Sequence, residues 1–498
     1  MKNTRGSSAQ LPFAMLVLML VLAALDQTIL STALPVMARE LAGDWPLAWA
    51  FSAYLLAATV VIALYGRLAD VLGRKPMLLL AIGLFLLGSL ACGASHDLRQ
   101  LVLARAVQGA GGGGLMTLTM LTVRELFSPE ERPRYQALLG ATYGVATMFG
   151  PLLGGTLVEH LSWHWAFWMN VPLAALAWGV LALTLPSGST EEGGPVAPGQ
   201  RASIDWLGAA LLAAALVSLL LATQRDKLHL PDGVTVWVLL ALGSALTAAF
   251  LWRQQRAAHP LLPLSLFASP AYAAASFIGL TTGVALYAAV VFLPQYLQIG
   301  LHLSPTSSAW HLLPLMGGLT AAAVTSGKLL RAQTPARKLG RVACMLMLLS
   351  FGLMAGVLGW LPEAPLALSA TLLPLGVGLG LLFPIVTVVA QRESPAEHLG
   401  IATAAPVMLR SLGGASGVAL LAALLSHLMH EELMAGRGMT AGAHVAANVV
   451  TAAMGHGLQS VFACAAVAVL LALVACGWLQ LKRVQAAPVE GVAGRVAA

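Results

Sequence analysis

Long apolar runs, separated by short breaks that carry charge, proline or glycine, recur along the whole chain. A helix needs about 20 apolar residues to cross ~30 Å of hydrocarbon, and fourteen runs approach that length. The runs cover residues 13–37, 47–68, 77–94, 101–123, 137–158, 165–185, 206–223, 234–251, 272–296, 307–327, 342–361, 366–390, 401–425 and 458–481. The pattern predicts an all-α integral membrane protein with fourteen transmembrane helices.

Composition agrees with this class. With 58% hydrophobic and 9% charged residues, the chain has too little polar surface to cover a soluble globule of 498 residues. The net charge of +7 is scattered over short loops instead of forming a basic patch, which argues against nucleic-acid binding. Four cysteines, at positions 92, 344, 464 and 476, lie in apolar runs without metal-ligand spacing. We expect them to be buried small hydrophobes, and we expect no metal site.

The distribution of lysine and arginine predicts the topology. Of the 27 basic residues, twenty fall in loops on the N-terminal side, five in the opposite loops and two within apolar runs. Cytoplasmic loops carry the excess of basic residues in membrane proteins. Both termini are therefore expected to be cytoplasmic, in a multi-pass protein of the cytoplasmic (inner) membrane. Lys2 and Arg5 precede a run too long for a cleaved signal, so we expect a retained first span.

The two halves of the chain echo each other, as transporter repeats do. Three alternate glycines of the fourth run, Gly109, Gly111 and Gly113, correspond to Gly376, Gly378 and Gly380 of the twelfth. Two adjacent glycines of the fifth run, Gly154 and Gly155, correspond to Gly413 and Gly414 of the thirteenth. This organisation predicts a six-helix bundle over residues 11–185, a cytoplasmic linker over 186–205, two inserted helices over 206–253, a second six-helix bundle over 272–481 and a cytoplasmic tail over 482–498.

Several motifs carry a family resemblance. They are "LDQTILSTALP" at 25–35, "GRLADVLGRKP" at 66–76, "LVLARAVQGAGGG" at 101–113, "ATMFGPLLGG" at 146–155, "SWHWAFWMNVP" at 162–172 and, in the second half, "LPQYLQ" at 293–298 and "LRSLGGASG" at 409–417. Together they resemble signature stretches of the major facilitator superfamily, and in particular its fourteen-span drug:proton antiporters of the EmrB/QacA type. The resemblance implies the major facilitator fold with two additional central spans, and export rather than import.

Asp26 is the unusual residue of the first run. A carboxylate near the bilayer centre costs about 2.5 to 3.5 kcal/mol on insertion scales, so its presence requires a reason. At 1.5 Å per residue, Asp26 and Arg105 lie at similar depth, about 21 and 22 Å from the inner face. The two residues form a structural ion pair, or Asp26 takes up and releases a proton and so couples proton flow to the movement of the bundles. Both interpretations remain open.

Two further motifs have candidate conformational roles. Gly66, Asp70, Gly73, Arg74 and Lys75 belong to the loop after the second run, where Asp70 can accept bonds from a helix end and latch the bundles together. Simple anchoring of the basic residues at the cytoplasmic face is the alternative. In the fifth run, Gly150, Pro151, Gly154 and Gly155 predict close helix packing and a bend.

The candidate substrate cavity contains aromatic, methionine and polar side chains, which suit an adaptable apolar pocket. Its residues are Tyr54, Gln108, Met116, Tyr143, Gln295, Trp310, His311 and Arg410. Arg410 faces the cavity or caps backbone carbonyls, and His311 titrates or is structural; each alternative stays open. As a set, the residues favour hydrophobic substrates, cationic ones among them.

The function predicted from the sequence is proton-coupled export of lipophilic compounds by alternating access. A transporter of a specific small metabolite, proton-coupled or facilitative, is the alternative. An enzyme is disfavoured, because no GxSxG, HExxH or Walker motif occurs and no catalytic residue is predicted. We expect no cofactor besides protons as coupling ion. The expected partners are a lipophilic small molecule and the bilayer, with a periplasmic adaptor protein as a further candidate.

Overall fold

The computed structural model describes residues 4–41, 48–128, 131–185, 205–222, 234–257, 260–332, 334–394, 399–439 and 447–479. The described part of the chain is almost entirely helical. The predicted linker up to residue 204 and the predicted tail at 482–498 lie outside these ranges.

Each predicted apolar run overlaps one helix or a pair of consecutive helices. The first half contains α1 (Thr4–Glu40), α2 (Ala48–Leu72), α3 (Arg74–Gly93), α4 (Leu98–Leu126), α5 (Arg132–His160), α6 (Trp165–Trp168) and α7 (Asn170–Thr184). The segment between the halves contains α8 (Trp206–Ala222) and α9 (Val234–Arg256). The second half contains α10 (Pro270–Gln295), α11 (Pro305–Trp310), α12 (Leu313–Arg331), α13 (Ala336–Trp360), α14 (Pro365–Arg392), α15 (Leu399–Met439) and α16 (Ala447–Ala475).

Two of the predicted runs are interrupted. The sixth divides into α6 and α7 at Met169, and the tenth divides into α11 and α12 at residues 311–312. In addition, α10 continues into a π-helical turn, η3 (Tyr296–Gly300). Within the described residues, nine helical stretches are long and apolar enough to cross a membrane. The chain is thus built as a multi-pass membrane protein, while the full count of fourteen crossings stays a prediction.

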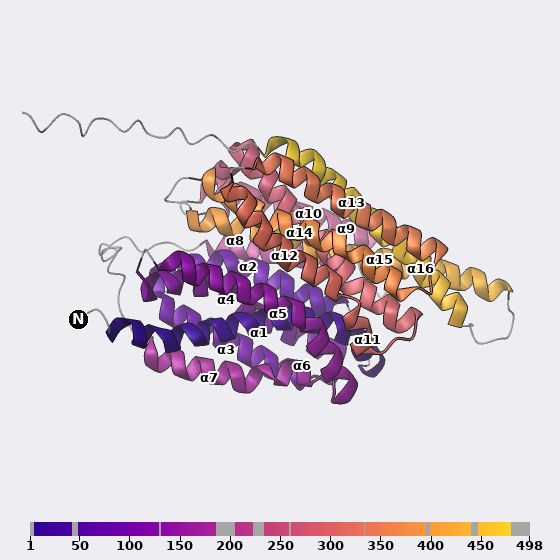
Figure 1. Cartoon of the computed structure of the whole chain (residues 1–498), viewed down its shortest axis with the longest axis horizontal. Helices are drawn as coiled ribbons and strands as arrows, with labels where there is room; N and C mark the ends of the chain where they lie inside the picture. The colour runs from indigo at the N-terminus through magenta and orange to yellow at the C-terminus, as the bar shows by residue number, and fades with distance from the viewer. Residues whose placement is uncertain are drawn as a thin grey trace, which may run out of the picture.

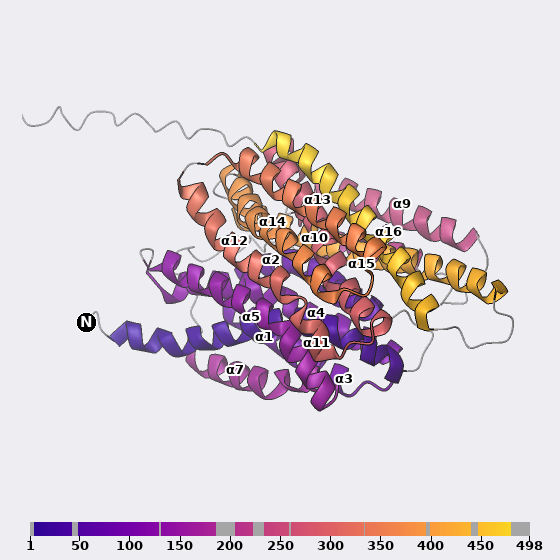
Figure 2. The same ribbon diagram turned by 45° about the vertical axis from the view of Figure 1, so that its right-hand side comes forward.

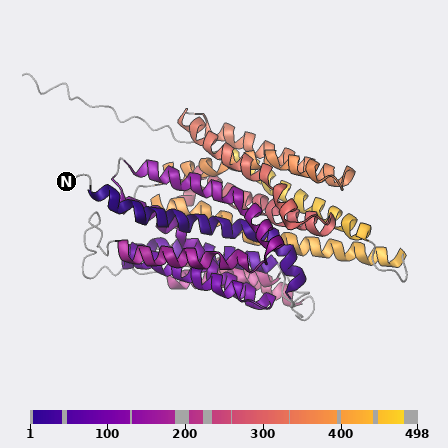
Figure 3. The same ribbon diagram turned by 60° about the horizontal axis from the view of Figure 1, so that its bottom comes forward.

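The halves form two bundles that lie side by side. Figure 1 shows α1 to α7, in indigo to magenta, mostly below α10 to α16, in pink to yellow, with α11 reaching down beside α5. Figure 2 shows the same arrangement, and in Figure 3 ribbons of the second half lie partly behind those of the first.

The glycine pairing between the halves is confirmed by what each glycine faces. In the first half, two α4 glycines face the α2 backbone and the one between them faces α3; in the second half, the α14 glycines face α12 and α13 in the same order. In α4, Gly109 and Gly113 face α2 and Gly111 faces α3. In α14, Gly376 and Gly380 face α12 and Gly378 faces α13. A Cβ atom at any of these positions would collide with the neighbouring helix, so the glycines set the helix spacing in both halves.

Hydrogen bonds between described residues of the two halves lie from the middle of the helices to the end where α1 finishes. At that end, Thr306 N–H donates to Glu159 Oε2 (3.0 Å) and Gln298 Nε2 donates to Thr32 O (3.0 Å). Nearer the middle, the Tyr287 hydroxyl donates to Gln27 Oε1 (3.4 Å). The halves are therefore joined on the side that the basic-residue distribution assigns to the outside.

The α8–α9 hairpin is closed at its base by Asp205. Asp205 Oδ1 accepts from Arg253 Nε (2.9 Å) and from Gly208 N–H (3.0 Å), which caps α8, while Oδ2 accepts from Gln254 Nε2 (2.8 Å). Burial raises the pKa of Asp205, but these hydrogen bonds outweigh burial and hold the pKa below its ordinary value. Gln254 Oε1 then accepts from Leu262 N–H (3.0 Å), which ties the hairpin to the segment leading into α10.

The cysteines differ in one respect from expectation. Cys92, Cys344 and Cys476 are buried, whereas Cys464 is exposed on the protein surface. The prediction for Cys464 was wrong, because an apolar sequence does not distinguish a helix face that meets other helices from one that meets lipid.

Candidate functional site

Asp26 and Arg105 meet in the interior of the first bundle. The Arg105 Nη1 atom lies 2.6 Å from Asp26 Oδ2, and both side chains are only 1% exposed. Asp26 comes from α1 and Arg105 from α4, and Arg105 Nε also donates to the Ala50 carbonyl of α2 (3.1 Å). The equal depth predicted from the sequence thus corresponds to a direct, charge-assisted pair.

Polar side chains from three helices complete this pair. Gln108 Nε2 donates to Asp26 Oδ1 (2.7 Å) and to Ser89 Oγ (2.9 Å), while Gln108 Oε1 accepts from Arg105 Nη1 (2.6 Å). Asn170, at the start of α7, donates to Asp26 Oδ1 at 3.4 Å. Both carboxylate oxygens are therefore occupied by N–H donors, which is the arrangement that stabilises a buried charge. We call Asp26, Ser89, Arg105, Gln108 and Asn170 the buried network.

The buried network is enclosed by aromatic rings. The Arg105 guanidinium lies over the ring of Tyr54, 4.3 Å from its centroid, and 5.8 Å from that of Phe167. Tyr54 and Gln108, both predicted to line the substrate cavity, are fully buried here against the pair. In this conformation they hold Arg105 in place and present no side-chain surface to a substrate.

Protonation of Asp26 would change this network in a defined way. The neutral acid no longer balances Arg105, and it replaces one acceptor oxygen with a donor. Arg105 would keep the Ala50 carbonyl and Gln108 Oε1 as acceptors but would lose its counter-charge. A buried cation without its partner is costly, so Arg105 depends on the Asp26 carboxylate in this arrangement.

Sequence reasoning missed Ser89, Asn170 and the Ala50 carbonyl as members of the network. For Gln108 a signal was available, because Arg105 and Gln108 are three residues apart on one helix and so share a face. Asn170 lies within the quoted motif at 162–172, but depth alone does not show which way it turns.

The loop motif after α2 is described in part. Gly73 has a φ of +91°, a conformation that favours glycine, and it precedes the first turn of α3. Arg74 Nη1 donates to the Leu121 carbonyl (3.4 Å) and Lys75 Nζ to the Leu185 carbonyl (2.7 Å), both within the first half. The side chain of Asp70, like the environment of Gly66, lies outside the described part, so the latch stays a prediction.

The fifth-helix motif joins α5 to helices on both sides. Gly150 and Gly154 face Thr28 and Thr32 of α1, and Pro151 lies inside the helix between them. Gly155 faces the backbone at Pro305, where α11 of the second half begins. The predicted close packing is present, and it extends across the junction between the bundles.

The remaining predicted cavity residues do not gather in one place. Met116, Tyr143 and Gln295 are half-buried, and Met116 packs in a small apolar cluster with residues of α1 and α5. Trp310 is 59% exposed on the protein surface. His311 lies at the break between α11 and α12, where its carbonyl accepts from Ser369 Oγ (2.9 Å).

Arg410 of α15 is half-buried, and its guanidinium lies 4.5 Å from the ring centroid of Phe383 on α14. The ring of Tyr287 on α10 lies against Gly414, one turn further along α15. The structure thus places Arg410 against an aromatic ring, while its role in a substrate cavity stays a prediction.

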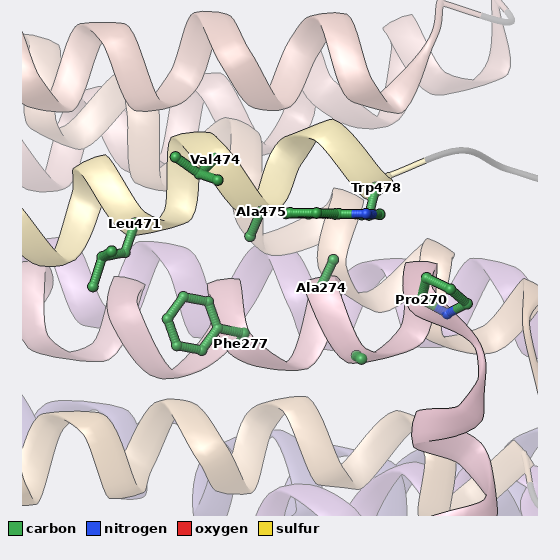
Figure 4. Close-up of a pocket in the computed structure, with 8 residues that line it drawn as sticks. Pro270, Ala274, Phe277, Leu471, Val474, Ala475 and Trp478 are labelled. Atoms are coloured by element: carbon green, nitrogen blue, oxygen red, sulfur yellow. The ribbon is translucent and has the colours of Figure 1, made fainter.

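A surface groove lies elsewhere, between the start of α10 and the end of α16. It encloses about 470 Å³ and is lined by Pro270, Ala273, Ala274, Phe277, Leu471, Val474, Ala475 and Trp478. Figure 4 shows these apolar side chains between the two helices. Trp478 and Phe277 are 55% and 39% exposed, as expected for a surface that contacts acyl chains, and no charged group lines the groove.

Comparison with known proteins agrees with the fold and the motifs. Residues 16–418 match the family model described as Major Facilitator Superfamily. An uncharacterized MFS-type transporter of Mycobacterium tuberculosis is 36% identical over 86% of this chain, which spans 61% of that relative's length. The multidrug transporter protein MdtP of Bacillus subtilis is 28% identical over 85% of this chain and 77% of its own.

Among solved structures, that of the peptide transporter POT in complex with sulfate is similar, with a TM-score of 0.65 and 18% identity over 95% of this chain and 96% of that one. At this identity the likeness concerns the fold alone. The matched family and fold are those of membrane transporters and not of enzymes. From its family match over residues 16–418, its two repeated bundles and its many apolar helices, the chain belongs to the Major Facilitator Superfamily.

Proposed function

We propose that this protein is a proton-coupled antiporter that exports lipophilic small molecules by alternating access. Fourteen helices would cross the cytoplasmic membrane with both termini in the cytoplasm, as in the EmrB/QacA type. The observation that carries the proposal is the buried network around Asp26.

Asp26 is suited to carry the proton because of where it lies. Among the described residues, the buried acids are Asp26 and Asp205, and Asp205 lies at a helix end where it closes a hairpin. Asp26 lies midway along α1 and contacts α4 and α7 through hydrogen bonds. Intramembrane acids that are paired in one state and accessible in another are the usual proton carriers of transporters.

The contacts between halves suggest how the proton is coupled to movement. In this conformation the halves meet toward the outer side, through Glu159, Thr306, Thr32 and Gln298, which corresponds to a state closed to the outside. Protonation of Asp26 in the opposite state would release Arg105 and change the packing of α1 against α4. Rocking of one bundle against the other would then return Asp26 to the inner side, where it loses the proton.

Export is supported by the relatives. The Bacillus subtilis protein is named a multidrug transporter, and an efflux pump of Gibberella fujikuroi is 32% identical over 86% of this chain. The direction and the multidrug character come to this chain only by that relationship.

The test is transport by purified protein in liposomes under an imposed pH gradient, with fluorescein and rhodamine 123 as anionic and cationic probes. Asp26→Asn keeps the size of the side chain and one acceptor oxygen but cannot carry a proton, so uphill movement of the probe should be lost. Asp97→Asn is the matched control, because Asp97 only caps the start of α4 and asparagine caps equally well. Uphill movement retained by folded Asp26→Asn protein would refute the proposal.

A further inference from the structure

We propose that the cluster around Arg410 binds the acidic group of an anionic amphiphile, so that the exported substrate carries a carboxylate or phenolate on a flat lipophilic body. The inference rests on the proposed export function and adds to it the chemical class of the substrate. It keeps the hydrophobic body that the sequence favoured but excludes the cationic compounds that were included among the expected substrates.

The first observation is that Arg410 has no acidic partner in the described part of the chain. It lies eleven residues after the start of α15, about 17 Å along the helix, and therefore deep in the membrane. Of the described acids of the second half, Glu363 and Glu393 lie just beyond helix ends. Glu431 and Glu432 lie inside α15 but 21 and 22 residues after Arg410, about 30 Å further along the helix. The printed sequence holds one further acid near α15, Glu397, which precedes that helix and lies outside the described residues.

The second observation is that Asp26 is not available to neutralise Arg410. Its oxygens are occupied by Arg105 at 2.6 Å, Gln108 at 2.7 Å and Asn170 at 3.4 Å. The described interior therefore contains one paired and one unpaired arginine, and its net charge is positive. A deep cation is costly to keep, and a bound anion offsets that cost.

The third observation is the set of groups beside Arg410. Tyr287 of α10 lies against Gly414, one turn along α15 from Arg410. Its hydroxyl reaches Gln27 of α1 at 3.4 Å. The Tyr287 ring also meets Phe51 of α2, with centroids 4.9 Å apart. Both halves thus contribute aromatic rings and polar groups to the buried surroundings of Arg410.

This chemistry matches an aromatic anion. A guanidinium binds a carboxylate through two parallel N–H bonds, and tyrosine hydroxyls can donate further bonds to it. The half-buried ring of Phe383, beside the guanidinium, suits a flat apolar body. A cationic compound would instead meet a like charge without an acid to offset it.

The experiment compares fluorescein with rhodamine 123, which share a xanthene ring but carry opposite charge. Binding is measured without a pH gradient, on the purified full chain in neutral phosphatidylcholine liposomes. Wild-type protein should bind fluorescein more tightly than rhodamine 123. Arg410→Gln should weaken fluorescein binding about tenfold or more and leave rhodamine 123 unchanged or tighter, since a charge-assisted bond is lost. Arg99→Gln, an exposed arginine at the outer end of α4, is the control and should change neither.

Two results would overturn the assignment. One is equal binding of fluorescein by wild-type protein and Arg410→Gln protein whose thermal unfolding is unchanged. The other is displacement of fluorescein when phosphatidylglycerol replaces part of the neutral lipid, which would make a lipid headgroup the ligand. Failure of the proposed antiport appears differently, because the wild-type protein would then bind fluorescein but not move it against a gradient.

Discussion

Two arginines, Arg105 and Arg410, lie deep in the described part of this protein, and they are held in opposite ways. Arg105 is fully buried, with a carboxylate at 2.6 Å, a glutamine at 2.6 Å and a backbone carbonyl at 3.1 Å. Arg410 is half-buried and rests on one aromatic ring, with Tyr287 packed one turn further along its helix. The charge of Arg105 is neutralised by a carboxylate of the protein itself. The charge of Arg410 is left for the anionic ligand proposed above.

The glycine pairing shows that this difference is specific to each half. When Gly109 is matched with Gly376, the position of Arg105 corresponds to Leu372, which is fully buried among apolar residues. The second half therefore repeats the helix packing of the first without repeating its ion pair. We infer that the fold is symmetric while the chemistry is divided, with proton binding in one half and substrate charge recognition in the other.

The largest effect is expected from breaking the Arg105 pair. Arg105→Ala leaves Asp26 as a buried, unpaired carboxylate and should lower the free energy of unfolding by about 3 to 5 kcal/mol. Thermal unfolding of the detergent-solubilised protein measures this change. The double variant Asp26→Asn with Arg105→Gln, which removes both charges, should recover most of the stability but not proton-driven transport. If the double variant is as unstable as Arg105→Ala, the loss comes from packing and not from the unpaired charge.

The second prediction gives Arg410 the partner that Arg105 already has. Phe383→Glu places a carboxylate on α14 beside the guanidinium, so the anion site should be occupied internally. Fluorescein binding should fall about tenfold or more, while binding of rhodamine 123 should be maintained or increase. Phe383→Gln, which removes the ring without adding charge, separates loss of stacking from neutralisation. Equal losses in the two variants would contradict a role for charge.

The third and smallest effect concerns the contact between the halves on the outer side. This contact joins the half proposed to bind the proton to the half proposed to bind the substrate. Hydrogen bonding by Thr306 holds the pKa of Glu159 below its ordinary value. When a contact lowers the pKa of a carboxylate, the ionised carboxylate stabilises that contact fully at pH values above the pKa of the free acid. This stabilisation is lost as the pH falls through the lowered pKa, because the carboxylate then becomes protonated. Glu159→Gln should therefore shift the protein modestly toward states open to the outside at neutral pH.

Spin labels at residues 161 and 302, in a variant without the native cysteines, would report this shift as longer distances between the outer ends. The same lengthening should appear in the protein that retains Glu159 when the pH is lowered, and it should be absent in Glu159→Gln. If the distance between the labels still lengthens at low pH in Glu159→Gln, the pH dependence of the contact comes from another group.

Much of the fold could be predicted from the sequence, because crossing a membrane imposes a length on each helix. The apolar run at 366–390 differs from α14 by only one or two residues at each end. The break at Met169 and the π-helical turn after Gln295 were not predicted, since local hydrogen bonding changes there without any change in hydrophobicity.

For the site residues, the sequence predicted the depth in the membrane but not the direction in which each side chain points. Height along a helix follows from residue number, which is why Asp26 and Arg105 could be paired. Rotation about the axis is set by packing, so the sequence did not reveal that Tyr54 faces Arg105 or that Trp310 faces outward. The charge balance near Arg410 also required the structure, because only there is it evident that Asp26 is already occupied.

The base of the α8–α9 hairpin suggests how a pair of helices can be placed between two repeated bundles. Asp205 satisfies the start of α8 and the end of α9, and Gln254 links both to the backbone of Leu262 before α10. A unit that pairs its own polar groups at the point of entry leaves none unpaired in the host chain. Such a hairpin could be acquired or lost in a single genetic event, as one self-contained module, while the two repeated bundles kept their packing.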